Sequence, residues 1–198
     1  MEELNQALFL MINAPDHAQA LLLAMARGVA EWSIWLIPLT LTFGWLRGDE
    51  RLRKLMLMAT ASGLAGLLIN QLIGLIWQHP RPFMIGLGHT FLAHAPDPSF
   101  PSDHLTLIWA VAFSLLLHER SRTAGLCLAL LGLPVAWARI YLGVHFPLDM
   151  AGAVLVALIS AWFIQREEHY FIDPLYRPIL SFYQLLASPL IRRGWMRD

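Results

Sequence analysis

Residues 55–77 read LMLMATASGLAGLLINQLIGLIW, a run of 23 positions without one charged side chain. A helix of this length is about 35 Å long, and the hydrocarbon core of a bilayer is about 30 Å thick. The composition agrees, because 57% of the chain is hydrophobic and 14% is charged, against about 45–50% and about 25% in soluble domains. The sequence therefore predicts a membrane protein, with a soluble helical bundle as the alternative.

Composition also excludes several other classes of protein. Lys plus Arg (14) equals Asp plus Glu (14), so bulk positive charge for binding nucleic acid is missing. The high apolar content argues against a disordered chain, and a single cysteine argues against a disulfide-stapled secreted domain. The length allows one membrane-embedded domain, predicted at residues 1–170, followed by a short tail at 171–198.

Four further runs are free of charged residues, at 32–46, 105–117, 123–138 and 150–165. Each run becomes long enough to cross a bilayer only when polar residues at one of its ends belong to the same helix. The predicted fold is an all-α bundle of five transmembrane helices, with a short interfacial helix near its N-terminus. The predicted transmembrane helices are 18–46, 55–77, 102–118, 123–142 and 149–166, and the interfacial helix is 4–12.

The basic residues are distributed unevenly between the two sides of this bundle. Loop 47–54, loop 118–122 and the segment after Gln165 together hold 11 of the 14 Lys and Arg residues. The first 19 residues hold none, but they include three acids. By the positive-inside rule the N-terminus should lie outside and the C-terminus in the cytoplasm. The tail 171–198, with three prolines and with Arg192, Arg193 and Arg197, is predicted to be a cytoplasmic amphipathic segment.

Two of the three basic exceptions lie at the outer ends of predicted helices, close to residues that can transfer protons. This outer set consists of Arg81, Arg139, His104, His145 and Asp149. Charged residues next to hydrocarbon are costly and tend to mark function, and guanidinium groups match phosphate oxygens. The set predicts an anion site equipped with a nucleophile and acid–base groups.

Other residues of the outer loops have open interpretations. Ser102 is expected to begin a helix, whose N-terminal N–H groups also favour an anion. Asp103 is either a helix-capping acid or a charge that favours protonation of a nearby histidine. We expect three further histidines to be loop residues outside the catalytic set, namely His79, His89 and His94. Zinc binding by His104, His145 and Asp149 is an alternative that lacks a tight metal-ligand spacing.

The spacing of these residues resembles the type 2 phosphatidic-acid phosphatase superfamily. Its three signatures have counterparts in chain order, as Arg81-Pro82, Pro101-Ser102-Asp103-His104 and Arg139-x5-His145-x3-Asp149. Two positions depart from the superfamily pattern, since Gly74 stands where a lysine is usual and Asp103 where a glycine is usual. Both departures resemble one branch, the bacitracin-resistance type of undecaprenyl-diphosphate phosphatase. Ala30-Glu31, residues 69–73 and residues 99–104 extend the resemblance over most of the chain.

The resemblance implies a phosphatase that acts on a polyprenyl diphosphate lipid at the outer face of a bacterial inner membrane, recycling the lipid carrier of cell-wall synthesis. His145 would be the nucleophile and form a phosphohistidine, Asp149 would orient it, and His104 would serve as acid and base. Arg81, Arg139 and Ser102 would bind the phosphate oxygens. The scheme requires no metal and no other cofactor. Glycerophospholipid monophosphates are alternative substrates, and a non-enzymatic transporter or scaffold is the remaining alternative.

Three polar residues of the first two predicted spans lie at the level of this site. Asn70 and Gln71 are expected to be supporting residues, as is Glu31. Glu31 either supports the site, by orienting an arginine or transferring a proton, or neutralises Arg27 one helical turn away.

Overall fold

The computed structural model describes residues 1–192, and every regular element within them is a helix. In chain order these are α1 (Glu2–Ile12), α2 (Ala20–Trp32), the 3₁₀ helix η1 (Ser33–Trp35), α3 (Leu36–Arg47), α4 (Glu50–Ile76), the 3₁₀ helix η2 (Pro82–Ile85), α5 (Asp103–Leu116), α6 (Arg122–Tyr141), α7 (Pro147–Arg166) and α8 (Glu168–Arg192). The predicted all-α class is confirmed for this part of the chain. Arg193 and Arg197 of the predicted tail 171–198 lie outside the described residues.

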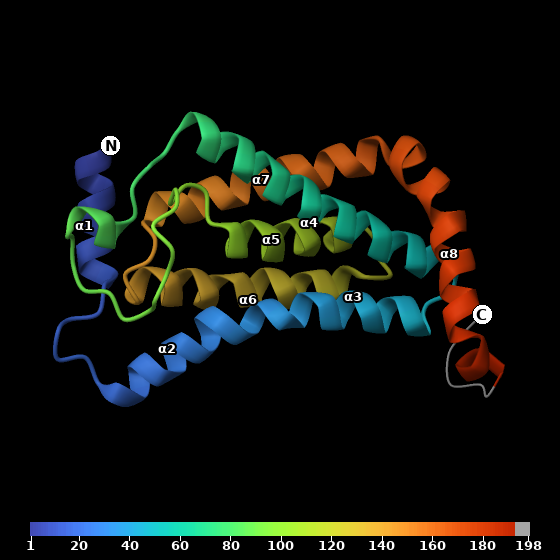
Figure 1. Cartoon of the computed structure of the whole chain (residues 1–198), viewed down its shortest axis with the longest axis horizontal. Coiled ribbons are helices and arrows are strands. Elements are labelled where there is room, and N and C mark those ends of the chain that lie inside the picture. Colours follow the sequence, from blue (N-terminus) through green and yellow to red (C-terminus); the bar gives the residue numbers. More distant parts are fainter. Residues whose placement is uncertain (193–198) are drawn as a thin grey trace.

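The helices form an elongated bundle around α5 (Figure 1). Nine of the 14 residues of α5 are buried, because α4, α6 and α7 all pack against it. The α2–α3 segment runs along the outside of this group, α1 covers one end, and α8 crosses the other. We call the α1 end the site end and the α8 end the basic end. The basic end includes the α3–α4 and α5–α6 connections, which carry many of the basic residues.

Within the described residues, four helical segments are long and apolar enough to cross a membrane: Ala20–Arg47, Glu50–Ile76, Arg122–Tyr141 and Pro147–Arg166. They correspond to four of the five predicted spans. The fifth prediction, 102–118, was too long, because α5 has 14 residues and is about 21 Å in length. In Figure 1, α5 is set back from the site end, and the α4–α5 connection occupies the space before it. The number of transmembrane spans therefore stays a prediction.

The first predicted span is not one continuous α-helix. The 3₁₀ turn η1 separates α2 from α3, and Pro38 follows in the first turn of α3. Proline has no backbone N–H to donate to the preceding turn, which explains why the α-helical hydrogen-bond ladder is interrupted here. Arg27 of α2 donates from Nε to the carbonyl of Phe91 at 2.8 Å. Among the ion pairs of residues 1–192, none joins Arg27 to Glu31, so the predicted neutralising pair is wrong.

Helix α4 begins five residues earlier than predicted because Asp49 caps it. The Asp49 carboxylate accepts a hydrogen bond from the N–H of Leu52 at 3.0 Å and one from Arg120 at 2.7 Å. The extension places Arg53 inside the helix, where it is buried, donates to the carbonyl of Trp45 and lies 4.9 Å from the ring of Tyr183. This basic residue therefore helps to hold α8 against α4.

The α4–α5 connection is fastened to the rest of the site end by Asn13. Its side-chain amide donates to the carbonyls of His89 (2.8 Å) and Tyr141 (3.1 Å) and accepts from the N–H of His89 (2.7 Å). Gly143 has a φ of +82°, and a Cβ there would collide with the carbonyl oxygen of His89. The connection and the α6–α7 turn therefore approach more closely than a side chain at residue 143 would permit.

We predict that Asn13→Ala lowers the free energy of unfolding by about 1–3 kcal/mol, since it removes three hydrogen bonds and leaves the N–H and the carbonyl of His89 without their partner. Thermal unfolding in detergent measures the loss, and limited proteolysis should cut faster within residues 86–95. Gln6→Ala is the matched control, because the Gln6 amide makes a 3.4 Å hydrogen bond to Glu2 on an exposed surface. Equal melting temperatures for Asn13→Ala and Gln6→Ala would contradict the fastening role.

Candidate active site

Five of the six residues predicted as catalytic or phosphate-binding are buried together at the site end. Arg81 precedes η2, Ser102 precedes α5, Arg139 lies in the last turn of α6, His145 lies in the α6–α7 turn and Asp149 lies in the first turn of α7. Four separate segments therefore contribute to one cluster, which depends on the way α5, α6 and α7 meet.

The pair His145 and Asp149 is formed by the start of α7. Asp149 Oδ2 lies 3.1 Å from His145 Nδ1 and also accepts the N–H of Phe146 at 2.8 Å, which caps the helix. Pro147, at the first helical position, has no N–H that would need a partner. Because a carboxylate oxygen accepts hydrogen bonds, the proton of the neutral imidazole is on Nδ1, and Nε2 carries the lone pair.

Ser99 completes this pair, and our sequence analysis did not assign it a role. Its hydroxyl donates to Asp149 Oδ2 and lies 3.4 Å from His145 Nδ1, and the residue is fully buried. Its backbone N–H donates to the carbonyl of His79 at 2.8 Å, which holds the residue in the connection. The available signal was a small polar residue three positions before Ser102, within the segment 99–104 that carries the family resemblance.

Two guanidinium groups lie at the lone-pair side of His145. Arg81 Nη1 is 3.0 Å and Arg139 Nη2 is 3.4 Å from His145 Nε2. Burial, followed by the charges of Arg139 and Arg81, holds the pKa of His145 well below its ordinary value. The imidazole is therefore neutral at physiological pH, and its nucleophilic nitrogen is directed at the place where the two arginines would hold an anion.

Arg81 is fixed in position by the connection itself. Its Nε and Nη2 atoms each lie 2.9 Å from Asp97 Oδ1, and its remaining donors reach the carbonyls of Val144 (2.9 Å) and Pro98 (3.2 Å). Asp97 is a second residue that sequence analysis did not identify. Its position in the chain, between two prolines, indicates a turn but not an arginine partner.

His94 lies in the α4–α5 connection, as expected of a loop residue, but the structure places it in contact with Arg139 of the cluster. Its Nε2 atom lies 3.1 Å from Arg139 Nη2, and its ring centroid is 6.0 Å from that of His145. The side chains of the other two loop histidines make their ion-pair contacts outside the cluster, although the carbonyl of His79 accepts from Ser99. His79 contacts Glu2 at 3.4 Å, and His89 lies 3.9 Å from Asp16.

Three buried polar atoms of the cluster have no hydrogen-bond partner among residues 1–192: Ser102 Oγ, Arg139 Nε and Asp149 Oδ1. Buried polar groups are nearly always paired, so unpaired ones require an explanation. Two of the three are donor groups, and both belong to residues for which the sequence predicts contacts to phosphate. An anion bound between α5 and α6 would supply the missing acceptor.

His104 lies in the first turn of α5 at the edge of the cluster. It is partly exposed, and it interacts electrostatically with Arg139, His94 and Arg81. Within the part of the chain that the structure describes, no hydrogen bond engages its ring. His104 can therefore contact a ligand that lies between the arginines.

The predicted supporting residues act next to the site, outside direct contact with His145. Asp103 accepts hydrogen bonds from Asn70 (2.8 Å) and Gln71 (3.5 Å), and Asn70 also donates to Thr106 at 3.0 Å. Ser102 is the capping residue of α5, so Asp103 instead joins α4 to the start of that helix. Glu31 is exposed and interacts with Arg139 through its charge.

The predicted zinc alternative finds no support in the geometry. Among residues 1–192 there is no group of three His, Cys, Asp or Glu side chains placed to hold a metal ion.

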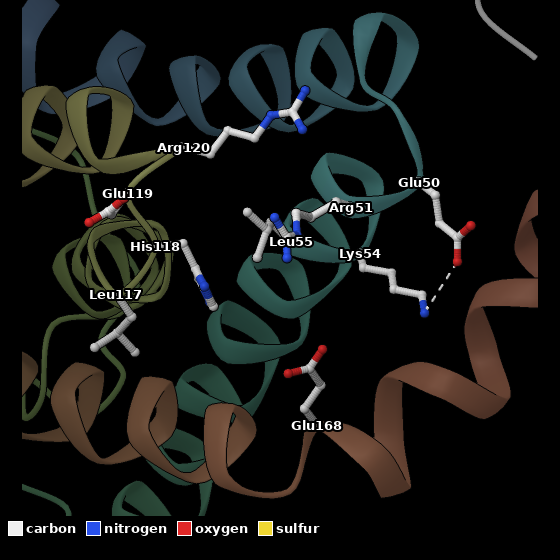
Figure 2. A pocket seen from close by; sticks show the side chains of 9 residues that line it. All are labelled: Glu50, Arg51, Lys54, Leu55, Leu117, His118, Glu119, Arg120 and Glu168. Carbon is white, nitrogen blue, oxygen red and sulfur yellow. Dashed lines mark ion pairs between the residues drawn. The ribbon is translucent and has the colours of Figure 1, made fainter.

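A polar cavity of about 910 Å³ lies at the basic end, separate from this cluster (Figure 2). Charged side chains of both signs line it, and Lys54 pairs there with Glu50 at 3.4 Å. It includes none of the predicted site residues, so it is not the candidate active site.

Comparison with known proteins identifies the family of the chain. Residues 54–172 match the PAP2 superfamily. Escherichia coli YbjG is 35% identical over 198 residues, the whole of both chains, and Bacillus subtilis undecaprenyl-diphosphatase BcrC is 34% identical over 96% of this chain and 97% of its own. The crystal structure of Aquifex aeolicus LpxE superimposes with a TM-score of 0.67 at 23% identity, covering 82% of this chain and 95% of LpxE. The chain belongs to the PAP2 superfamily, and it is a phosphatase.

We predict that Ser99→Ala lowers kcat about tenfold, with a small effect on KM, because Asp149 loses one of the donors that orient it beside His145. The measurement is phosphate release under saturating lipid substrate. Ser160→Ala is the matched control, since Ser160 is an equally buried serine that donates to the carbonyl of Ala157 within α7. Equal kcat values for the two variants would show that Ser99 does not position the pair.

Proposed function

We propose that this phosphatase hydrolyses undecaprenyl diphosphate to undecaprenyl phosphate and inorganic phosphate through a phosphohistidine on His145. The observation that carries the proposal is the neutral Nε2 of His145, which lies 3.0 Å and 3.4 Å from the guanidinium groups of Arg81 and Arg139. The similarity to BcrC over nearly the whole of both chains supports the choice of lipid.

In the first step, Nε2 of His145 attacks the terminal phosphorus, and the bond from that phosphorus to the bridging oxygen breaks. His104 gives a proton to the departing undecaprenyl phosphate. Arg81, Arg139 and the hydroxyl of Ser102 bind the equatorial oxygens, over which negative charge is spread in the transition state. Asp149 stabilises the positive charge that develops on the imidazole ring.

In the second step, water attacks the phosphohistidine. His104, now neutral, takes a proton from that water while the nitrogen–phosphorus bond breaks. Inorganic phosphate leaves and His145 returns to its neutral form, with the proton on Nδ1 still bonded to Asp149. Arginine side chains supply the positive charge that this scheme requires, so neither a metal ion nor another cofactor takes part.

The proposed orientation follows from the two ends of the bundle. The basic end would lie in the cytoplasm, and the site end, with the N-terminus, would face the periplasm or cell exterior of a bacterial inner membrane. Residues 1–170 would form the membrane-embedded domain, with the remaining tail at the cytoplasmic surface. Membrane lipids would surround the bundle, and the lipid diphosphate would reach the site from the outer leaflet.

We predict that the purified wild type releases phosphate from undecaprenyl diphosphate and that His145→Ala lowers kcat by at least about 10⁴-fold, since no other group can form the covalent intermediate. Phosphatidylglycerophosphate and phosphatidic acid should be cleaved more slowly when compared by kcat/KM. A higher kcat/KM for either glycerophospholipid would overturn the choice of lipid and leave the mechanism standing. Full activity of His145→Ala would overturn the mechanism.

We also predict that EDTA leaves kcat/KM unchanged, because guanidinium groups provide the charge that a metal ion supplies in other phosphatases. The control is the same preparation with Mg²⁺ or Zn²⁺ restored. Inactivation by EDTA that either ion reverses would contradict the metal-free scheme.

A further inference from the structure

His94 is held in a defined orientation at the phosphate side of the cluster. Its Nδ1 lies 3.2 Å from the carbonyl oxygen of Ala95, and a carbonyl oxygen accepts hydrogen bonds, so Nδ1 carries the proton. The lone pair is therefore on Nε2, which accepts from Arg139 Nη2 at 3.1 Å. The same Nη2 lies 3.4 Å from His145 Nε2, so the lone pairs of two imidazoles are directed at one guanidinium nitrogen.

A phosphoryl group attacked by His145 must lie about 3 Å from its Nε2. Arg139 Nη2, 3.4 Å from His145 Nε2, is within reach of that position, and His94 Nε2 lies 3.1 Å from the same guanidinium nitrogen. Phosphate oxygens accept hydrogen bonds, and an unprotonated Nε2 also accepts, so the two would repel each other. The contact becomes favourable only when His94 carries a second proton, which turns the acceptor into a charge-assisted donor.

We propose that His94 binds the terminal phosphate of the substrate as an imidazolium and takes up one proton from solution when that phosphate enters. The proposal rests on the proposed function, because it requires a phosphate at His145. It adds a third cation to Arg81 and Arg139. Helix α4 supplies no further cation, because it packs against the connection where Gly74 faces Pro98 and its residues there are uncharged.

The charges around His94 agree with the uptake of a proton when an anion binds. Burial, then the positive charges of Arg81 and Arg139, lower the pKa of His94, whereas Asp97 and the carbonyl of Ala95 raise it. Asp97 Oδ1 is 3.6 Å from His94 Nδ1, and it pairs with Arg81 as well. The other titratable groups of the cluster are His104 of α5, His145 of the α6–α7 turn and Asp149 of α7. Asp103 and Glu31 add negative charge near Arg139. A bound dianion offsets both arginines and so favours the protonated form.

Anion binding at His94 is expected to weaken as pH rises. His94 is neutral without the anion and protonated with it, so binding is strongest below the pKa of the unbound site and weakens as pH rises above that value. The probe is sulfate, a tetrahedral dianion that does not itself titrate near neutral pH. Calorimetry in two buffers of different ionisation enthalpy should show about one proton per sulfate whose uptake depends on His94, with affinity falling as pH rises by up to about tenfold per pH unit for each proton taken up.

Four variants separate His94 from its neighbours. His94→Lys should bind sulfate with one proton fewer taken up than in the wild type, and His94→Gln should bind about 10- to 100-fold more weakly, the loss expected for one charge-assisted hydrogen bond. His89→Gln, on the same connection and away from the cluster, should match the wild type, and His104→Gln should retain the proton uptake. Thermal unfolding checks that each variant is folded.

Proton uptake by His94→Lys equal to that of the wild type, or undiminished sulfate affinity in His94→Gln, would overturn the role of His94. A folded wild type that does not bind sulfate would overturn it too. These results are independent of the lipid assay. A wild type that binds sulfate with His94-dependent proton uptake but does not cleave undecaprenyl diphosphate would overturn the proposed substrate alone.

Discussion

The hydrogen bonds to Asp149 Oδ2 are the interaction on which the site end depends. This one oxygen accepts from the N–H of Phe146, from the hydroxyl of Ser99 and from Nδ1 of His145. The first bond begins α7, the second holds the α4–α5 connection, and the third fixes the tautomer of His145, the proposed nucleophile. The start of α7 therefore cannot shift without moving the imidazole of His145, because one carboxylate both caps the helix and orients that ring.

The charge of the cluster shows what it is suited to bind. Arg81 and Arg139 are buried beside one buried carboxylate, Asp149, while Asp97 is exposed. Unpaired buried charge is unfavourable, so the two guanidiniums are held by carbonyl oxygens, by Asp97 and by imidazole nitrogens. An arriving phosphate can replace these weaker acceptors with negative charge. The site is thus organised for an anion before the anion arrives, which lowers the reorganisation needed during reaction.

Sequence patterns predicted the positions of the helices well in the segments that are long and free of charge. Long charge-free runs located α4, α6 and α7 within five residues at each end, because hydrocarbon tolerates few charges. The spacing of Arg139, His145 and Asp149 predicted the cluster, because residues three or four positions apart lie close together where a helix begins. Ser99, Asp97 and His94 were missed for a different reason. They lie in a connection of some 26 residues without periodicity, and their contacts follow from its path across α6 and α7.

The short α5 makes space for the α4–α5 connection, which carries residues of the cluster that contact α6 and α7. Helix α5 is six residues, or about 9 Å, shorter than α6 and α7, and it is set back from the site end. The α4–α5 connection occupies the space before α5 (Figure 1). Its residues Arg81, His94 and Ser99 make hydrogen bonds with α6, α7 and the turn between them. The proposed orientation would place this cluster toward the outer leaflet. The diphosphate of the proposed substrate would then bind to the arginines while its polyprenyl chain stays in the bilayer.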